Sequence, residues 1–163
     1  MVAVQERLCH ALPDSVDLRH AALIEPIATG HRAVKIARTT LTVDLADASI
    51  LILGSGPIGI GLISVLRRLG SRKIYVSQPS EKRRDLAREL ADVVINPKEE
   101  SVPKRCRTLT GGKGIDVVFD SAGVQSALND GMEALGFKGT YVNIALWEIP
   151  VRGTDPISSL LLV

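Results

Sequence analysis

The sequence is poor in aromatic residues, in cysteine and in net charge. Aromatic residues make up 3% of its 163 positions, too few for a surface on which nucleic-acid bases stack. The formal net charge of +2 is too small to indicate nucleic acid or an anionic membrane as a partner. Cys9 and Cys106 lack a Cys-x-x-Cys spacing, which excludes both a disulfide framework and a self-contained structural zinc site.

Long apolar runs are also missing. No segment approaches the ~18 consecutive apolar residues of a membrane-spanning helix, and residues 1–13 lack the apolar core of a signal peptide. We therefore expect a cytoplasmic protein without a membrane partner, in a compartment that keeps thiols reduced. With 45% hydrophobic and 23% charged residues, the chain has the composition of a globular domain, long enough to fold without metals or disulfides.

Short apolar runs alternate with segments of helical periodicity. This pattern predicts buried strands at 49–53, 73–77, 92–95, 115–119 and 139–144, and helices at 17–25, 30–37, 57–69, 81–90, 103–109 and 125–135. Pro26 is expected to end the first helix. The alternation predicts right-handed crossovers and an α/β fold, a Rossmann doubly wound parallel sheet of about five strands with flanking helices. We expect an N-terminal helical segment over 1–48 and the Rossmann domain over 49–163.

One motif, a glycine-rich loop, indicates a ligand-binding site. Gly54-Ser-Gly-Pro-Ile-Gly59 fits the spacing G-x-G-x-x-G and lies between a predicted strand and a predicted helix, where a dinucleotide-binding loop belongs. Gly54 allows the tight turn, Gly56 allows a pyrophosphate to approach the backbone, and Gly59 allows the helix to pack close to the strand. The phosphates would then meet the positive end of the helix dipole. Another Rossmann ligand such as S-adenosylmethionine, or a purely structural turn, remains an alternative.

The end of the second predicted strand bears on the choice of cofactor. A dinucleotide-binding domain often has an acid here, which binds the adenosine ribose, but this sequence has Gln78. Gln78 is either a plain polar strand-end residue or a ribose contact that no longer repels a 2′-phosphate. Of the basic residues Lys82, Arg83 and Arg84, at least two are expected to be exposed at the start of a helix. We therefore expect NAD or NADP as the cofactor, with either a preference for NADP or relaxed specificity.

Several motifs together resemble the medium-chain dehydrogenase/reductase family, the zinc-type alcohol, polyol and butanediol dehydrogenases. They are Leu12-Pro13, AALIEPI at 21–27, ATGHRAV at 28–34, ILILGSGPIG at 50–59, GIDVVFDSAG at 114–123 and GTYV at 139–142. The resemblance covers the chain from about residue 10 to 155 but only the cofactor-binding domain of the family. It implies an oxidoreductase that transfers hydride between an alcohol or ketone and NAD(P).

The resemblance also assigns roles to individual residues. It places Glu25 at or near a ligand of the catalytic zinc, although Glu25 could equally be an ordinary helix-end carboxylate. The resemblance also implies cofactor-binding residues beyond the glycine loop and Gln78. The full predicted set is Thr29, Gly54, Gly56, Pro57, Ile58, Gly59, Gln78, Arg83, Ser121, Ala122, Asn143, Ile144 and Ala145. The sequence assigns no catalytic residue.

Parts of the family pattern are missing from these 163 residues. The family's GroES-like domain supplies zinc ligands, and the motifs of that domain are absent, so residues 1–48 would be a remnant of the catalytic domain and its connection. Cys9, His10, His20 and His31 fit none of the family's ligand motifs and are expected to be structural or surface residues. We therefore expect that zinc is not held by this chain alone.

The C-terminal end gives a further expectation. The chain ends at Ser158-Ser-Leu-Leu-Leu-Val163, so we expect it to stop before the family's sixth strand and to form no defined dimer. The leading hypothesis is the cofactor-binding half of a zinc-type dehydrogenase. The alternatives are a non-catalytic nucleotide-binding module and, less favoured by Gln78, an S-adenosylmethionine-dependent methyltransferase.

Overall fold

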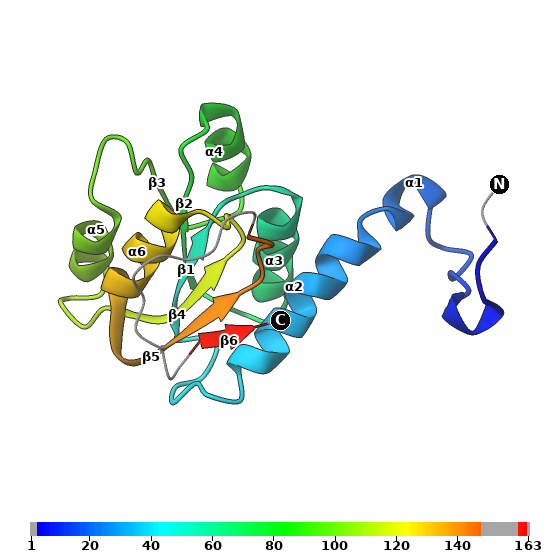
Figure 1. Cartoon of the computed structure of the whole chain (residues 1–163), viewed down its shortest axis with the longest axis horizontal. Coiled ribbons are helices and arrows are strands. Elements are labelled where there is room, and N and C mark those ends of the chain that lie inside the picture. The colour runs from blue at the N-terminus through cyan, green and yellow to red at the C-terminus, as the bar shows by residue number, and fades with distance from the viewer. Residues whose placement is uncertain (1–2, 148–159, 163) are drawn as a thin grey trace.

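The core of the molecule is a parallel β-sheet with helices on both faces (Figure 1). The computed structural model describes residues 3–147 and 160–162. Its sheet has the order β3-β2-β1-β4-β5-β6. The strands are β1 (Ser49–Leu53), β2 (Lys73–Ser77), β3 (Val93–Ile95), β4 (Ile115–Asp120), β5 (Leu135–Asn143) and β6 (Leu160–Leu162). The Rossmann fold class predicted from the sequence is confirmed.

The helices divide between the two faces. On one face, α2 (Ile24–Ala37), α3 (Pro57–Arg68) and α4 (Glu81–Arg88) pack on Ile50, Ile52 and Val76. On the other face, α5 (Val102–Leu109) and α6 (Gln125–Ala134) pack on Leu51, Leu53 and Val118. Every residue of β1 is therefore buried, which is why this strand reads as an unbroken apolar run.

The sheet extends one strand further than the sequence suggested. The expectation that the chain stops before a sixth strand is wrong, because Leu160–Leu162 forms β6 and pairs in parallel with Tyr141–Asn143 of β5. The unpaired N–H and C=O groups along the edge of β5 offer hydrogen bonds to any extended segment, and three residues are enough to use them. The short apolar run at Leu160–Leu162 is thus an edge strand.

The N-terminal helices also differ from the prediction. A short helix, α1 (Leu18–Ala21), begins after Asp17, whose side chain accepts a hydrogen bond from the N–H of Arg19 at 2.8 Å. Pro26 does not end a helix. It lies in the first turn of α2, where a residue needs no N–H because the helix provides no acceptor there.

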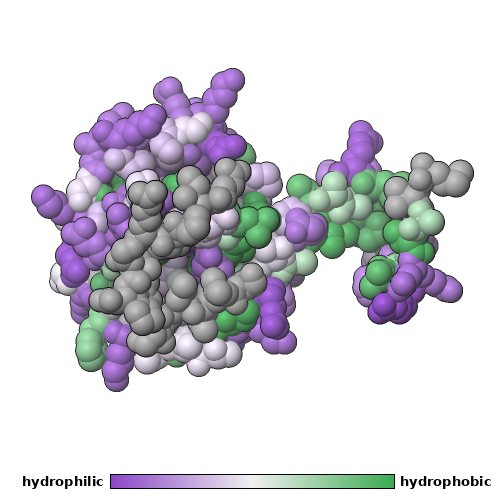
Figure 2. Space-filling model, in the orientation of Figure 1, coloured by the Kyte–Doolittle hydropathy of each residue, from purple (hydrophilic) through white to green (hydrophobic). Residues whose placement is uncertain are grey.

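Figure 1 shows α1 and the residues before it, which include a 3-10 turn (Glu6–Leu8), reaching away from the α/β body along the line of α2. Leu18 on this arm is 79% exposed, and Figure 2 shows apolar surface along it. α2 packs closely on α3, since a Cβ at Gly30 would lie 3.0 Å from the Cα of Leu62. Among the described residues, no helix is both long and apolar enough to cross a membrane.

Candidate functional site

The glycine loop joins the end of β1 to the start of α3. Gly54 has φ +89°, a conformation that L side chains rarely adopt, and a Cβ at Gly59 would lie 2.3 Å from the carbonyl oxygen of Gly54. Both glycines are therefore required by the backbone itself. Gly56 differs, because its φ of −72° suits any residue and nothing lies within 4 Å of the position of its missing Cβ.

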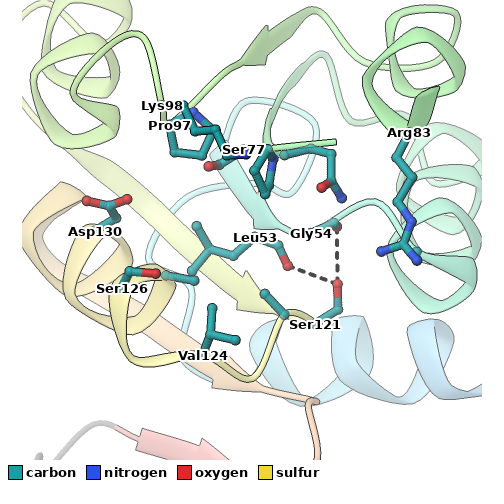
Figure 3. A pocket seen from close by; sticks show the side chains of 15 residues that line it. Leu53, Gly54, Ser77, Arg83, Pro97, Lys98, Ser121, Val124, Ser126 and Asp130 are labelled. Atoms are coloured by element: carbon teal, nitrogen blue, oxygen red, sulfur yellow. Dashed lines mark hydrogen bonds between the residues drawn. The ribbon is translucent and has the colours of Figure 1, made fainter. Parts of the chain in front are cut away.

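A cavity of about 500 Å³ opens beside this loop, at the carboxyl ends of β1, β2 and β4. In a doubly wound sheet, ligands bind at this edge, where the crossovers change direction. Six of the predicted cofactor-binding residues line the cavity: Gly54, Gly56, Gln78, Arg83, Ser121 and Ala122. The fold thus brings together residues from four separate segments of the sequence (Figure 3).

Gln78 is held in one orientation at the end of β2. It is buried, its N–H donates to the carbonyl of Ile95, and its side-chain oxygen accepts a hydrogen bond from the N–H of Ser80 at 3.0 Å. The N–H of Ser80 uses one lone pair of that oxygen, and the NH₂ group of the amide has no hydrogen-bond partner among the described residues. Gln78 therefore offers donors to a ligand.

The basic residues after β2 have two different roles. Arg84 is buried, and its guanidinium donates to the carbonyls of Gln78 and Pro79 at 3.1 and 2.7 Å, so it supports the strand end. Lys82 and Arg83 are exposed at the start of α4, as expected for two of the three. Figure 3 shows Arg83 reaching from α4 toward the glycine loop, where its positive charge faces the cavity.

The loop after β4 is tied to the glycine loop and to the interior. The hydroxyl of Ser121 donates to the carbonyls of Leu53 and Gly54 at 2.9 and 3.1 Å, as the dashed lines in Figure 3 show. The carboxylate of Asp120 is fully buried and accepts from the N–H groups of Ala122 and Gly123 at 2.8 and 3.1 Å.

Asp120 also has a side-chain partner. Its second oxygen accepts a hydrogen bond from the hydroxyl of Tyr141 at 2.9 Å. Burial, reinforced by the Asp120 carboxylate, raises the pKa of Tyr141, so the hydroxyl stays protonated and remains the donor. The buried negative charge is thus satisfied by three donors rather than by a cation.

The remaining predicted residues lie outside the cavity. Asn143 is the last residue of β5, and the N–H groups of Ile144 and Ala145 after it donate to the carbonyl of Asp120 at 2.8 and 3.0 Å. Pro57 lines a second hollow of about 430 Å³ on the α2 side of the loop, together with Gly56 and Arg83. Ile58 and Gly59 are in the first turns of α3, and neither lines the first cavity.

Thr29 and Glu25 lie together on α2, where the Thr29 hydroxyl donates to the Glu25 carboxylate at 3.2 Å. Neither residue lines the cavity. In the part of the chain that the structure describes, no three His, Cys, Asp or Glu side chains come together as a metal site, so Glu25 has no partner ligands there. The prediction that Glu25 binds zinc stays a prediction.

Sequence reasoning missed several residues that line the cavity. Pro97 and Lys98 follow β3, and Val124, Ala127 and Asp130 come from the start of α6 and the loop before it. Their position in the sequence could have indicated them, because the carboxyl ends of all parallel strands meet at one edge of the sheet. The strand predicted at 92–95 ends at this edge, but the sequence carries no motif that assigns Pro97 and Lys98 to the site.

Comparison with known proteins agrees with this geometry. Residues 57–162 match the family described as zinc-binding dehydrogenase. The chain is 37% identical to a probable diacetyl reductase [(R)-acetoin forming] of Saccharomyces cerevisiae and 35% identical to the (R,R)-butanediol dehydrogenase of Neisseria gonorrhoeae. The alignments cover 90% and 91% of this chain but only 35% and 41% of those proteins.

A solved structure shows the same relationship. The 2R,3R-butanediol dehydrogenase of Bacillus subtilis superposes with a TM-score of 0.77 at 27% identity, covering 93% of this chain and 43% of that one. The 163 residues therefore span less than half the length of these relatives. The chain belongs to the zinc-binding dehydrogenase family, among the medium-chain dehydrogenase/reductases that its sequence resembles.

Proposed function

We propose that this chain is the nicotinamide-dinucleotide-binding half of a zinc-type alcohol or polyol dehydrogenase, which transfers hydride between an alcohol or ketone and NAD(P). The observation that carries the proposal is the open space at Gly56. No protein atom within 4 Å explains why this position lacks a side chain, yet it borders the cavity at the N-terminus of α3. A pyrophosphate bound there would supply the missing reason, because it needs close approach to the backbone.

The residues around Gly56 suit the parts of a dinucleotide. The first-turn N–H groups of α3 and the guanidinium of Arg83 would hold the phosphates, and Gln78 would contact the adenosine ribose. Ser121 and Ala122 would lie near the adenosine, while Thr29, Ile58, Asn143, Ile144 and Ala145 would lie toward the nicotinamide. The bound cofactor supplies or accepts the hydride, and these residues fix its position.

We also propose the cofactor preference. A carboxylate at the end of β2 would accept hydrogen bonds from the ribose hydroxyls and repel a 2′-phosphate. Gln78 instead presents an NH₂ group, since its oxygen is engaged by Ser80. Two N–H donors and the nearby charge of Arg83 complement phosphate oxygens, which supports NADP or relaxed specificity.

The described part of the chain does not supply a complete catalytic zinc site. The residues described here do not fit a catalytic zinc, which needs three protein ligands, because Glu25 is the single candidate and is exposed on α2. We propose that Glu25 is at most one contributor to a shared site and that this chain does not hold zinc by itself. No step of the proposed function is therefore assigned to a metal on this chain.

We also propose that the chain has two parts. The division into a segment over 1–48 and a Rossmann domain over 49–163 is supported by the strand at Ser49, although α2 packs on the domain core. We further propose a cytoplasmic protein that forms no defined dimer. The absence of a dimer cannot be argued from an uncovered sheet edge, because β6 covers the edge of β5. Exposed Leu18, Leu23 and Ile24 instead favour non-specific association.

Titration of the 163-residue chain with NADH, NADPH and S-adenosylmethionine, followed by cofactor fluorescence or calorimetry, tests the proposed function. We expect saturable binding of the reduced nicotinamide cofactors and none of S-adenosylmethionine. Binding without turnover would equally fit a non-catalytic module, because the described residues offer no complete zinc site in either case. Absence of binding to either nicotinamide cofactor would contradict both.

A further inference from the structure

The cavity has two chemically different ends. Figure 3 shows Arg83 beside the glycine loop at one end and Asp130 at the other, with Leu53 between them. Arg83 brings a positive charge to the end where phosphates would bind. Asp130 brings a carboxylate to the far end, which is also lined by Pro97 and Lys98. The far end therefore carries both a carboxylate and an ammonium group, whereas the end beside the glycine loop carries a guanidinium alone.

The carboxylate of Asp130 has no hydrogen-bond or salt-bridge partner among the described residues, Lys98 included. It is partly buried on α6, and burial, reinforced by the charge of Glu133, raises its pKa. A partly desolvated acceptor without a donor is costly, and a ligand that brings an N–H group would remove the cost. This is a feature of the site that the glycine loop does not explain.

The walls near Asp130 indicate which donor fits. Pro79, Pro97, Val124 and Ala127 line the same cavity with apolar groups. Apolar walls suit a flat aromatic base, and a carboxylate at the edge of the base suits an amino group rather than a carbonyl oxygen. Adenine has such a 6-amino group, whereas hypoxanthine has a carbonyl oxygen at the same position, which a carboxylate would repel.

We propose that Asp130 is a specificity-determining residue that accepts a hydrogen bond from the 6-amino group of the cofactor's adenine and so selects adenine over 6-oxopurines. The inference rests on the proposed function, because it requires that the base lie at this end of the cavity. Binding at the opposite end is governed by Arg83 and the glycine loop. The two ends can therefore be tested separately.

The experiment compares NADH with reduced nicotinamide hypoxanthine dinucleotide, which differs from it only in the base. Both are titrated into the wild-type chain and into Asp130→Ala and Glu133→Ala variants. Glu133→Ala is the matched control, since it removes one carboxylate from the exposed side of the same helix without touching the cavity. Circular dichroism verifies that each variant is folded.

We expect the wild type and Glu133→Ala to bind NADH at least about tenfold more tightly than the hypoxanthine analogue, the scale of one charge-assisted hydrogen bond. In Asp130→Ala the ratio should fall to near one. Equal binding of both dinucleotides by the wild type, or an unchanged ratio in Asp130→Ala, would overturn the inference and leave the proposed function standing. Failure to bind NADH, its analogue and NADPH would overturn both.

Discussion

We propose that one side chain, Gln78, sets the choice between NADH and NADPH. Replacing Gln78 by Glu keeps the length of the side chain and the acceptor that binds the N–H of Ser80, but exchanges the NH₂ group for a charged oxygen. We predict that the wild type binds NADPH at least as tightly as NADH. In Gln78→Glu, the Kd for NADPH should rise about tenfold or more relative to that for NADH, because the carboxylate repels the 2′-phosphate.

Fluorescence titration at fixed ionic strength measures these affinities. Arg83→Gln and Lys82→Gln form a matched pair, since both remove one charge from the start of α4 but only Arg83 lines the cavity. We expect Arg83→Gln to weaken the binding of NADPH and Lys82→Gln to leave it unchanged. If the wild type prefers NADH tenfold and Gln78→Glu leaves that preference unchanged, Gln78 does not contact the ribose.

The two thiols should differ sharply in reactivity. Cys106 is completely buried on α5, and burial, with smaller contributions from Asp130 and Glu100, raises its pKa to about 12. Because the thiolate is the reactive form, Cys106 should be inert toward a disulfide reagent at pH 8, while exposed Cys9 reacts. We predict one reactive thiol in the native chain and two in denaturant. Two rapidly reacting thiols in the folded protein would contradict the packing of α5.

At the scale of the elements, β4 and β5 are joined by a buried polar contact as well as by their ladder. Tyr141 donates to the carboxylate of Asp120, whose other oxygen holds the loop after β4. We predict that Tyr141→Phe lowers the free energy of unfolding by about 1–3 kcal/mol, because it removes one donor from a buried charge.

Tyr75→Phe is the matched control in the same sheet. Tyr75 is also buried, but its hydroxyl has no hydrogen-bond partner among the described residues. Its loss should change the stability little. Urea unfolding of both variants measures the difference. Equal effects of the two substitutions would show that the contact with Asp120 contributes nothing specific.

The element pattern could largely be predicted because the signals were local. The run at 49–53 and the helical spacing over 57–69 each reflect burial of that segment, so β1 and α3 appear as expected. Pro26 was misinterpreted because a proline that stops a helix and one in its first turn have the same sequence. The pairing of Leu160–Leu162 depends on the free edge of β5, which is a property of the tertiary structure.

The site was predictable in part for the same reason. Gly54 and Gly59 are required by backbone geometry that the spacing G-x-G-x-x-G encodes. Asp130 and Lys98 carry no motif, and their place at the cavity follows only from where α6 packs and where β3 ends. The orientation of the Gln78 amide depends on a hydrogen bond two residues away, which the sequence alone does not show.

The whole 163-residue chain should bind cofactor without catalysing a dehydrogenase reaction. The described residues offer Glu25 as the one candidate zinc ligand, and a catalytic zinc needs three. We predict that the 163-residue chain binds nicotinamide cofactor but does not oxidise alcohols or reduce ketones. Metal analysis and a dehydrogenase assay check this. Stoichiometric zinc together with turnover that a chelator abolishes would show that the chain is a complete enzyme.

The central claim, that the cavity beside the glycine loop binds a dinucleotide, is tested most directly at Gly56. Its φ of −72° and the empty space around it allow Gly56→Val without disturbing the fold, so the free energy of unfolding should change by less than about 0.5 kcal/mol. A valine there would occupy the space that the pyrophosphate needs. Calorimetric titration with NADPH should therefore show at least about tenfold weaker binding than the wild type. Unchanged affinity in a folded Gly56→Val variant would contradict the account.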